Sequence, residues 1–445
     1  MASDDLPCAA AGSARSHAER VRGLDGARVL VGVCGGIAAY KAAHLVRGLV
    51  ASGAQVHVVP TPASLQFVGA ATWEALSHHP VRTSVFEDVD QVAHVRLGQE
   101  ADLVVVAPAT ADLLARVRMG RADDLLAAGL LVTRAPVIMA PAMHTEMWEH
   151  PATRENVEVL RRRGVHVMDP AVGRLTGADS GPGRLPEPES ILDRVRAVAE
   201  APRDAEGRVR QDLAGQRVLI SAGGTREDLD PVRYLTNASS GKQGWALAEA
   251  ALARGAQVTL LAATVDRETP SGARRRDVRS AEDLAAAVAE ERGQHDVLIM
   301  AAAVADFTPT TRGAAKIKKD DSGGVPELPL RRTPDILAES VQARHDGAPS
   351  PRVIVGFAAE TGDDAATALE HARQKARRKG ADLLVVNDVS GDVFGSDRNA
   401  VHMLDATGEE LSRAEGSKTA VAHAVLDAVV ECAAEALDRR GGDVP

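Results

Sequence analysis

The sequence lacks the features that would mark a secreted, membrane or nucleic-acid-binding protein. Its 445 residues include three cysteines, Cys8, Cys34 and Cys432, too few and too scattered for a disulfide framework or a metal-binding pattern. No apolar run reaches the ~18 residues that a membrane-spanning helix needs. The formal net charge of −10 argues against a broad nucleic-acid surface. We therefore expect a cytoplasmic protein that binds neither membranes nor nucleic acids.

Two segments, 28–59 and 217–261, share one α/β pattern: an apolar strand, a glycine turn, a helix and a second strand. This repeat predicts two doubly wound, Rossmann-like α/β domains, although neither turn carries a full dinucleotide fingerprint. A chain of this length can build two separate cores. The expected divisions are a disordered tail at 1–26, a first domain at 27–200, a charged linker at 201–215, a second domain at 216–437 and a tail at 438–445.

The most informative loop, 230–244, connects the first strand and first helix of the second domain. It is rich in small residues, hydroxyls and amides, and Arg233 and Lys242 add positive charge. Free N–H groups at a helix start bind anions, and glycine lets a ligand approach closely. The loop is not a Walker A motif, because Gln243 follows Lys242. It predicts a phosphate or nucleotide site, against the alternative of an ordinary capped helix start.

In the first domain, small and hydroxyl residues follow three expected strands, at 61–64, 108–110 and 141–144. Because ligands of open α/β sheets bind outside the carboxyl ends of strands, these loops and the Gly35–Gly36 turn predict one crevice for a flat aromatic cofactor. Taken singly, each loop also fits an ordinary tight turn.

Two further features suggest function. His94 precedes a buried strand, and histidine is the residue type whose unperturbed side chain suits proton transfer near neutral pH, with a structural histidine as the alternative. The irregular segment 308–334 is too long for a plain connector and predicts a binding arm.

Several motifs resemble those of known enzyme families. Motifs of the first domain resemble flavin-dependent cysteine decarboxylases: Gly35–Lys41, Ala107–Asp112, Pro141–Met143 and Gly181–Arg184. Motifs of the second resemble phosphopantothenate–cysteine ligase: Asp230–Tyr234, Ser239–Lys242, Ala301–Asp306 and Lys316–Lys319. Their order over residues 27–435 resembles the bifunctional phosphopantothenoylcysteine decarboxylase/phosphopantothenate–cysteine ligase family.

The resemblance implies two successive reactions of coenzyme A biosynthesis. The C-terminal nucleotide-binding ligase domain would activate 4′-phosphopantothenate with CTP, and L-cysteine would attack the acyl-cytidylate. The N-terminal flavodoxin-like domain would use FMN to decarboxylate the product to 4′-phosphopantetheine. The flavin is needed because the carboxylate has no electron sink until the thiol carbon is oxidised. Mg²⁺ is the second implied cofactor, with ligands left unknown.

The resemblance also implies roles for individual residues. The catalytic residues would be His94 in decarboxylation, Lys316 in forming the acyl-cytidylate and Asn237 in holding it. Implied FMN contacts are Gly35, Gly36, Ile37, Thr61, Ser64, Pro108, Ala109 and Thr110. Implied substrate contacts are Met143, His144, Arg184 and Arg233. Implied CTP contacts are Met300, Ala301, Ala302, Asp306, Lys316, Pro334, Asp335, Ile336, Leu337, Phe357, Lys375 and Lys379. The last two lysines, four residues apart in a helical stretch, share one face, for which a solvated basic face is the alternative.

The chain departs from the family at two positions. His144 stands where the decarboxylases usually have an asparagine that contacts the substrate carboxylate, and a histidine can also donate there. Gly177 stands where they often have a flap cysteine that acts as an acid, so the last step needs another proton source, with Thr176, Asp179 and water as candidates. Cys34, in the first glycine turn, is interpreted as structural.

The same resemblance implies a homo-oligomer with a trimer-based decarboxylase core and a dimeric ligase domain. Two other functions remain open. One is a flavin-dependent cysteine decarboxylase for another substrate whose ligase-like domain only binds, and Asn237 and Lys316 argue against it. The other is a regulatory flavoprotein, and His94 argues against it.

Overall fold

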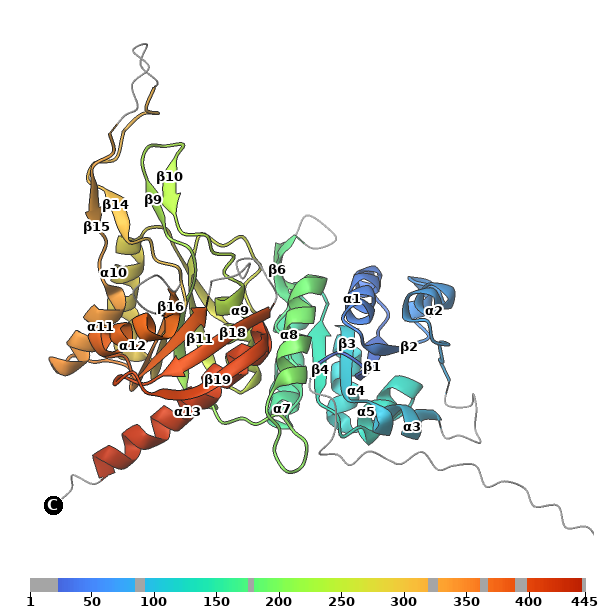
Figure 1. Ribbon diagram of the computed structural model, residues 1–445. Coiled ribbons are helices and arrows are strands. Elements are labelled where there is room, and N and C mark those ends of the chain that lie inside the picture. The colour runs from blue at the N-terminus through green and yellow to red at the C-terminus, as the bar shows by residue number, and fades with distance from the viewer. Residues whose placement is uncertain are drawn as a thin grey trace, which may run out of the picture.

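The computed structural model describes residues 23–84, 93–174, 180–318, 327–360, 367–388 and 398–441. They form two α/β units, one coloured blue to green and the other green to red (Figure 1). Each unit has a largely parallel sheet with helices on both faces, which confirms the predicted doubly wound class. None of the helices in these ranges is both long and apolar enough to span a membrane.

The first sheet has five parallel strands in the order β2-β1-β3-β4-β5. The strands are β1 (Arg28–Val33), β2 (Gln55–Pro60), β3 (Leu103–Ala109), β4 (Val137–Pro141) and β5 (His166–Val167). Every residue of β3 is buried, because helices cover both of its faces. The strand order reverses between β1 and β3, which is where ligands bind in such folds.

Alternate strand residues face opposite helix layers: Val29 and Val31 point to one core and Leu30 to the other. The first layer contains α1 (Ala39–Ala51), α2 (Ala70–Ser77) and α8 (Pro188–Glu200). The second contains α4 (Ala111–Met119), α5 (Leu125–Val132), α6 (Thr145–Glu149) and α7 (Pro151–Arg162). Helix α3 (Ala93–Glu100) packs beside α5.

The second sheet has eight strands in the order β12-β11-β8-β13-β16-β17-β18-β19, parallel from β12 to β17 and antiparallel at the β18–β19 edge. The parallel strands are β8 (Arg217–Gly223), β11 (Gln257–Ala263), β12 (Arg274–Val278), β13 (Val297–Met300), β16 (Val353–Glu360) and β17 (Leu383–Asp388). The edge strands are β18 (Arg398–Leu404) and β19 (Glu410–Ser417). Here the order reverses between β8 and β13.

Helices again cover both faces of this sheet. One face carries α9 (Lys242–Ala253) and α13 (Lys418–Gly441). The other carries α10 (Ala281–Glu291), α11 (Ile336–His345) and α12 (Ala368–Lys379).

Three hairpins lie outside the sheets. They are β6 (Ala171–Arg174) with β7 (Ser180–Arg184), β9 (Arg226–Asp228) with β10 (Tyr234–Thr236), and β14 (Phe307–Pro309) with β15 (Leu330–Arg332). The last two extend from the same end of the second unit (Figure 1). The predicted arm at 308–334 is therefore built on the β14–β15 hairpin, and its residues 319–326 lie outside the described ranges.

The two units meet through α8 and α9, which pack together in the middle of the molecule (Figure 1). Arg194 of α8 and Glu249 of α9 form an ion pair of 2.6 Å with side-chain exposures of 6% and 4%. Burial raises the pKa of Glu249 although Arg194 opposes this shift. Within the expected linker, Val209 belongs to the first core and Leu213 to the second, so the boundary is itself packed.

We predict that Glu249→Ala lowers the free energy of unfolding by about 3–5 kcal/mol, because it leaves the Arg194 charge buried without its partner. Urea unfolding followed by circular dichroism at matched protein concentration measures the change. The control is Glu290→Ala, which removes a largely exposed partner of Arg276 and costs at most about 1 kcal/mol. Equal urea midpoints for the two variants would show that breaking the α8–α9 ion pair costs no more stability than breaking an exposed one.

Candidate functional site

A cavity of about 760 Å³ opens at the carboxyl edge of the first sheet, beside the reversal between β1 and β3. It gathers most of the residues that the sequence assigned to the first domain. The predicted cofactor contacts in its lining are Gly35, Gly36, Ile37, Pro108 and Thr110. The predicted substrate contacts there are Met143, His144 and Arg184.

The glycine turn between β1 and α1 shapes one wall of this cavity. A Cβ on Gly35 would lie 2.7 Å from the Cβ of Ala63, whereas a Cβ on Gly36 would meet nothing within 4 Å. Helix α1 has Ala38 at its N-cap and therefore no side-chain hydrogen bond to its first N–H groups. These features fit a ligand that approaches the backbone closely and carries an anionic group.

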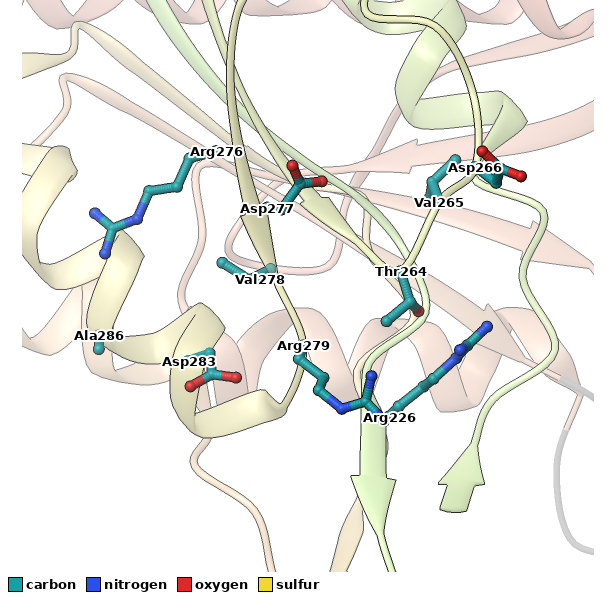
Figure 2. A pocket seen from close by; sticks show the side chains of 10 residues that line it. All are labelled: Arg226, Thr264, Val265, Asp266, Arg276, Asp277, Val278, Arg279, Asp283 and Ala286. Carbon is teal, nitrogen blue, oxygen red and sulfur yellow. The ribbon is translucent and has the colours of Figure 1, made fainter. Parts of the chain in front are cut away.

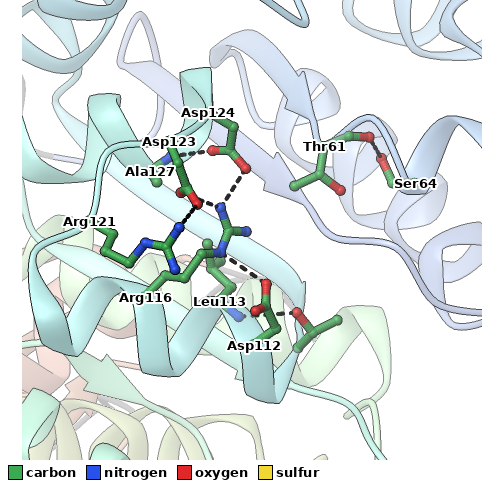
Figure 3. A network of polar contacts seen from close by, with 10 residues as sticks. Thr61, Ser64, Asp112, Leu113, Arg116, Arg121, Asp123, Asp124 and Ala127 are labelled. Carbon is green, nitrogen blue, oxygen red and sulfur yellow. Dashed lines mark hydrogen bonds and ion pairs between the residues drawn. The ribbon is translucent and has the colours of Figure 1, made fainter.

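The turn after β2 contains Ala63 and lies against the Gly35 side of this wall. Figure 3 shows Thr61 and Ser64 of this turn. The Ser64 hydroxyl donates to the Thr61 carbonyl oxygen at 2.7 Å. The Thr61 hydroxyl is buried and has no hydrogen-bond partner among the described residues. Neither residue lines the cavity itself, and Ala109 is buried inside β3.

An ion-pair network fixes the helices next to the cavity (Figure 3). The largely buried Arg116 of α4 binds Asp112 at 2.9 Å on its own helix. It also binds Asp123 at 2.9 Å and Asp124 at 2.7 Å at the start of α5. The network holds α4 in place, and Thr110, which caps that helix, lines the cavity.

The cavity lining also contains cationic groups that the sequence reasoning did not assign, Lys41 and Arg174. The Lys41 ammonium donates to the Glu187 carboxylate at 2.8 Å, and Arg184 binds the same carboxylate. Burial tends to raise the pKa of Glu187, but the hydrogen bonds from Lys41 and Arg184 outweigh it and lower the pKa. Lys41 is the last residue of the Gly35–Lys41 motif, whereas no sequence pattern points to Glu187, which lies 146 residues farther along the chain.

Two predicted features of the first domain lie where side chains are not described. His94 belongs to α3, but its side chain is outside the described part, and so are Thr176, Gly177 and Asp179.

Cys34 is buried, and burial raises the pKa of its thiol to about 11. The thiol is therefore protonated at neutral pH, in agreement with a structural role.

A second cavity, of about 490 Å³, lies where the loop 230–244 meets the carboxyl ends of β13 and β16. Helix α9 begins there after Gly241, which has a φ of +70° and provides no side-chain cap. A Cβ on Gly244 would lie 2.3 Å from the Cβ of Ala222, so only glycine lets the helix approach β8 this closely. The first turn of α9 therefore lines the second cavity, and a helix N-terminus is a favourable place for an anionic group.

Some of the predicted nucleotide contacts line this second cavity and others surround it. Ala301, Ala302 and Phe357 line it, and Met300 is buried just before them. The predicted contacts outside the lining are Asp306, Lys316, Pro334, Asp335, Ile336, Leu337, Lys375 and Lys379. Asp335 and Lys379 nevertheless form an ion pair, so α11 and α12 bring two of them together.

A group of side-chain amides in the second cavity was not predicted from the sequence. The Asn399 side chain donates to Gln243 and to Asn387, each at 3.2 Å. The Gln243 amide donates to the carbonyl oxygen of Lys418 at 3.1 Å. These residues come from α9, β17, β18 and α13, and the order of the strands alone brings them together.

The predicted ligase residues Asn237 and Arg233 are held by hydrogen bonds to the backbone. The Asn237 amide donates to the Val304 carbonyl oxygen at 2.9 Å, just beyond β13. The Arg233 guanidinium donates to the Ile317 carbonyl oxygen at 2.6 Å, next to the exposed Lys316. The loop 230–244 therefore touches both the end of β13 and the base of the arm.

A third cavity, of about 650 Å³, lies beside β12 and α10 and carries several arginines (Figure 2). Arg279 is paired with Asp228 at 2.7 Å, and Arg276 with Glu290 at 2.6 Å. None of the predicted site residues belongs to its lining. We therefore assign neither predicted site to this cavity.

Among the described residues, no group of three or more His, Cys, Asp or Glu side chains is arranged to hold a metal ion. The predicted Mg²⁺ therefore stays a prediction. Because Mg²⁺ is often bound through substrate phosphates, a nucleotide would supply several of its ligands.

Two protein-family models match the chain. The model described as "Flavoprotein" matches residues 17–200. The model described as "DNA/pantothenate metabolism flavoprotein C-terminal domain" matches residues 213–433.

The chain is also similar to proteins named Coenzyme A biosynthesis bifunctional protein CoaBC. The relative from Mycobacterium tuberculosis is 56% identical over 406 residues, which are 91% of this chain and 96% of the relative. The relative from Vibrio cholerae is 43% identical over 92% of this chain and 100% of its own length. The solved C-terminal domain of a protein of that name is 35% identical at a TM-score of 0.39, covering 49% of this chain and 96% of that domain.

We predict that Gly35→Ala lowers the affinity for FMN about tenfold or more, because the added methyl group overlaps Ala63 and displaces the glycine turn that forms one wall of the cavity. Titration of flavin-free protein followed by flavin fluorescence measures the affinity. The matched control is Gly129→Ala in α5, where the same methyl group meets nothing within 4 Å. An unchanged affinity in Gly35→Ala would show that the flavin does not use this wall.

Proposed function

The chain belongs to the family of bifunctional coenzyme A biosynthesis proteins, and we propose that it ligates cysteine to 4′-phosphopantothenate and then decarboxylates the product to 4′-phosphopantetheine. One observation carries this proposal: residues from the motifs of the two activities line two separate cavities, one in each unit, in a chain 56% identical to a bifunctional relative over 91% of its length. Yellow purified protein with cysteine- and CTP-dependent pyrophosphate release tests it. A cytoplasmic location stays a prediction from the sequence.

In the ligase half, the second cavity suits the phosphates of CTP. The N-terminus of α9 offers backbone N–H groups, and Lys242 and Lys418 add positive charge at the cavity. Lys316, at the base of the arm, neutralises the charge that develops as pyrophosphate leaves. Asn237 then holds the acyl-cytidylate by hydrogen bonds while cysteine attacks. Arg233, the residues at the start of α11 and the lysines near the end of α12 complete the predicted contacts, and Mg²⁺ accompanies the triphosphate.

In the decarboxylase half, the first cavity holds FMN and phosphopantothenoylcysteine. The bound flavin accepts and returns the electron pair that makes loss of CO₂ possible. The cations of the lining, Lys41, Arg174 and Arg184, attract the anionic groups of the substrate. His144 donates to the carboxylate in place of the usual asparagine, and His94 moves the proton.

Exposed apolar side chains around the first cavity support a homo-oligomer. Ile37, Tyr40 and Met147 all line this cavity and are 62%, 56% and 48% exposed. Apolar groups this exposed beside a binding site mark a protein–protein contact. A trimer-based decarboxylase core with a dimeric ligase domain would cover them, and a monomer in light scattering would contradict this assembly.

The two alternatives differ from the proposal in what the second unit does. A decarboxylase with a ligase-like unit that only binds would not release pyrophosphate from CTP. A regulatory flavoprotein would bind flavin without turnover. The cavity that receives the start of α9, together with Asn237 and Lys316, favours a catalytic ligase over both.

We predict that His94→Asn abolishes CO₂ release while FMN binding and cysteine ligation persist, because the two reactions use different units. Coupled assays with phosphopantothenoylcysteine and with phosphopantothenate measure the two activities on one preparation. Loss of ligation in the same variant would point to misfolding or to a wrong division of the chain.

A second prediction separates the two half-reactions of the ligase. Lys316→Gln should form no acyl-cytidylate, because the departing charge is no longer neutralised. Asn237→Asp should form it but turn it over about a hundredfold more slowly, which corresponds to ~2.7 kcal/mol of lost stabilisation. Mass spectrometry of reactions quenched without cysteine decides between these outcomes. Abundant acyl-cytidylate from Lys316→Gln would overturn the role of that lysine.

A further inference from the structure

The base of the arm lies along the loop between β9 and β10 and is attached to it at successive points. Arg312 pairs with Asp228 at 3.0 Å. The Gly313 N–H donates to the Leu229 carbonyl oxygen at 2.9 Å. Four residues farther on, the backbone of Ile317 meets the loop again. The chain that carries Lys316 is therefore fixed on both sides of that lysine.

The contact at Ile317 is made by two side chains. Its N–H donates to the Asp230 carboxylate at 3.1 Å, and its carbonyl oxygen accepts from the Arg233 guanidinium at 2.6 Å. Asp230 and Arg233 also bind each other, with distances of 2.9 and 2.6 Å from the Asp230 Oδ2. The pair holds both polar groups of one residue in the way that a neighbouring strand would.

The Asp230 side chain is buried, and both of its carboxylate oxygens accept hydrogen bonds. Its side chain has 0% exposure, and its other oxygen accepts the backbone N–H groups of Val232 and Arg233, each at 2.8 Å. Burial alone would raise its pKa, but the hydrogen bonds from Arg233 and from backbone N–H groups hold the pKa well below its ordinary value. A buried carboxylate whose two oxygens are both occupied fixes the position of whatever it binds.

We propose that Asp230, together with Arg233, is a positioning residue that sets Lys316 for the formation of the acyl-cytidylate. This inference rests on the proposed ligase function. The same loop continues through Thr236, whose hydroxyl donates to the Thr225 carbonyl oxygen at 2.7 Å, to Asn237. One short loop thereby places the residues of both half-reactions, Lys316 through the clamp on Ile317 and Asn237 through the chain itself.

The chain offers a closely matched control for this clamp. Asp204 forms a similar turn, accepting the N–H groups of Glu206 at 3.1 Å and Arg208 at 2.8 Å and the side chain of Arg208 at 2.8 Å. That turn lies in the expected linker, and the hydrogen bonds of Asp204 described above stay within it, away from the arm. Asp204→Asn therefore removes the same local interactions without releasing Ile317.

The experiment compares Asp230→Asn with Asp204→Asn in the full-length protein. In either orientation, the amide group of an asparagine at 230 faces N–H donors. These are the Ile317 N–H and the Arg233 guanidinium, or the backbone N–H groups of Val232 and Arg233, so the clamp is broken while the side-chain volume is kept. We expect acyl-cytidylate formation to slow roughly tenfold or more in Asp230→Asn, as for the loss of one charge-assisted contact. Asp204→Asn should match the wild type. Decarboxylation of added phosphopantothenoylcysteine should be unchanged in both, which shows that each variant is folded.

Limited trypsin digestion provides a readout that does not depend on catalysis. Cleavage after Lys316 requires the Ile317 backbone to leave its partners, so its rate reports release of the clamp. Mass spectrometry should show this cut roughly tenfold faster in Asp230→Asn and unchanged in Asp204→Asn. Arg233→Lys keeps the positive charge but loses the planar guanidinium that donates to both Asp230 and Ile317, so it should resemble Asp230→Asn. The double variant should be cleaved only slightly faster than either single variant.

The outcomes separate this inference from the proposed function. Faster cleavage after Lys316 with normal acyl-cytidylate formation would make the clamp merely structural and overturn the positioning role. Wild-type cleavage and wild-type acyl-cytidylate formation in Asp230→Asn would overturn the clamp itself. Wild-type protein that forms no acyl-cytidylate would instead contradict the ligase function on which the inference rests.

Discussion

The requirement that both faces of a parallel sheet be covered is the constraint on which both sites depend. Parallel strands need crossover connections, and these connections place helices on the two faces and loops at one edge. In the first sheet this edge carries the glycine turn before α1, and in the second it carries the loop before α9. Neither helix has a side-chain cap at its N-terminus, and the start of each borders a cavity.

Several charged side chains with little exposure bind residues that are distant in the chain. Arg194 binds Glu249 between the units, and Lys41, in the lining of the first cavity, binds Glu187. Asp230 holds the backbone of Ile317 at the base of the arm. Such pairs add little net stability compared with apolar packing, but they fix relative positions, which is what a site assembled from separate loops requires.

The arrangement of two sites on one chain has a chemical consequence. The product of the ligase reaction is the substrate of the decarboxylase, and the cavities proposed for the two reactions lie at the edges of different sheets. The units are joined by packed helices and a buried ion pair instead of a free tether, so the two cavities keep a defined relation. Variants in one cavity can therefore be assayed against the other as an internal reference.

The sequence by itself determined the two strand–turn–helix units, the glycine loops and the order of the family motifs, because apolar runs and glycine turns are local signals. It could not show that Glu187 binds two cations of the first cavity or that the amides of Asn387 and Asn399 line the second. Nor could it show that Arg233 binds the backbone of Ile317, 84 residues farther on. Those contacts depend on which strands become neighbours and on how the arm folds back, and spacing along the chain carries no record of either. Only the tertiary structure decided them.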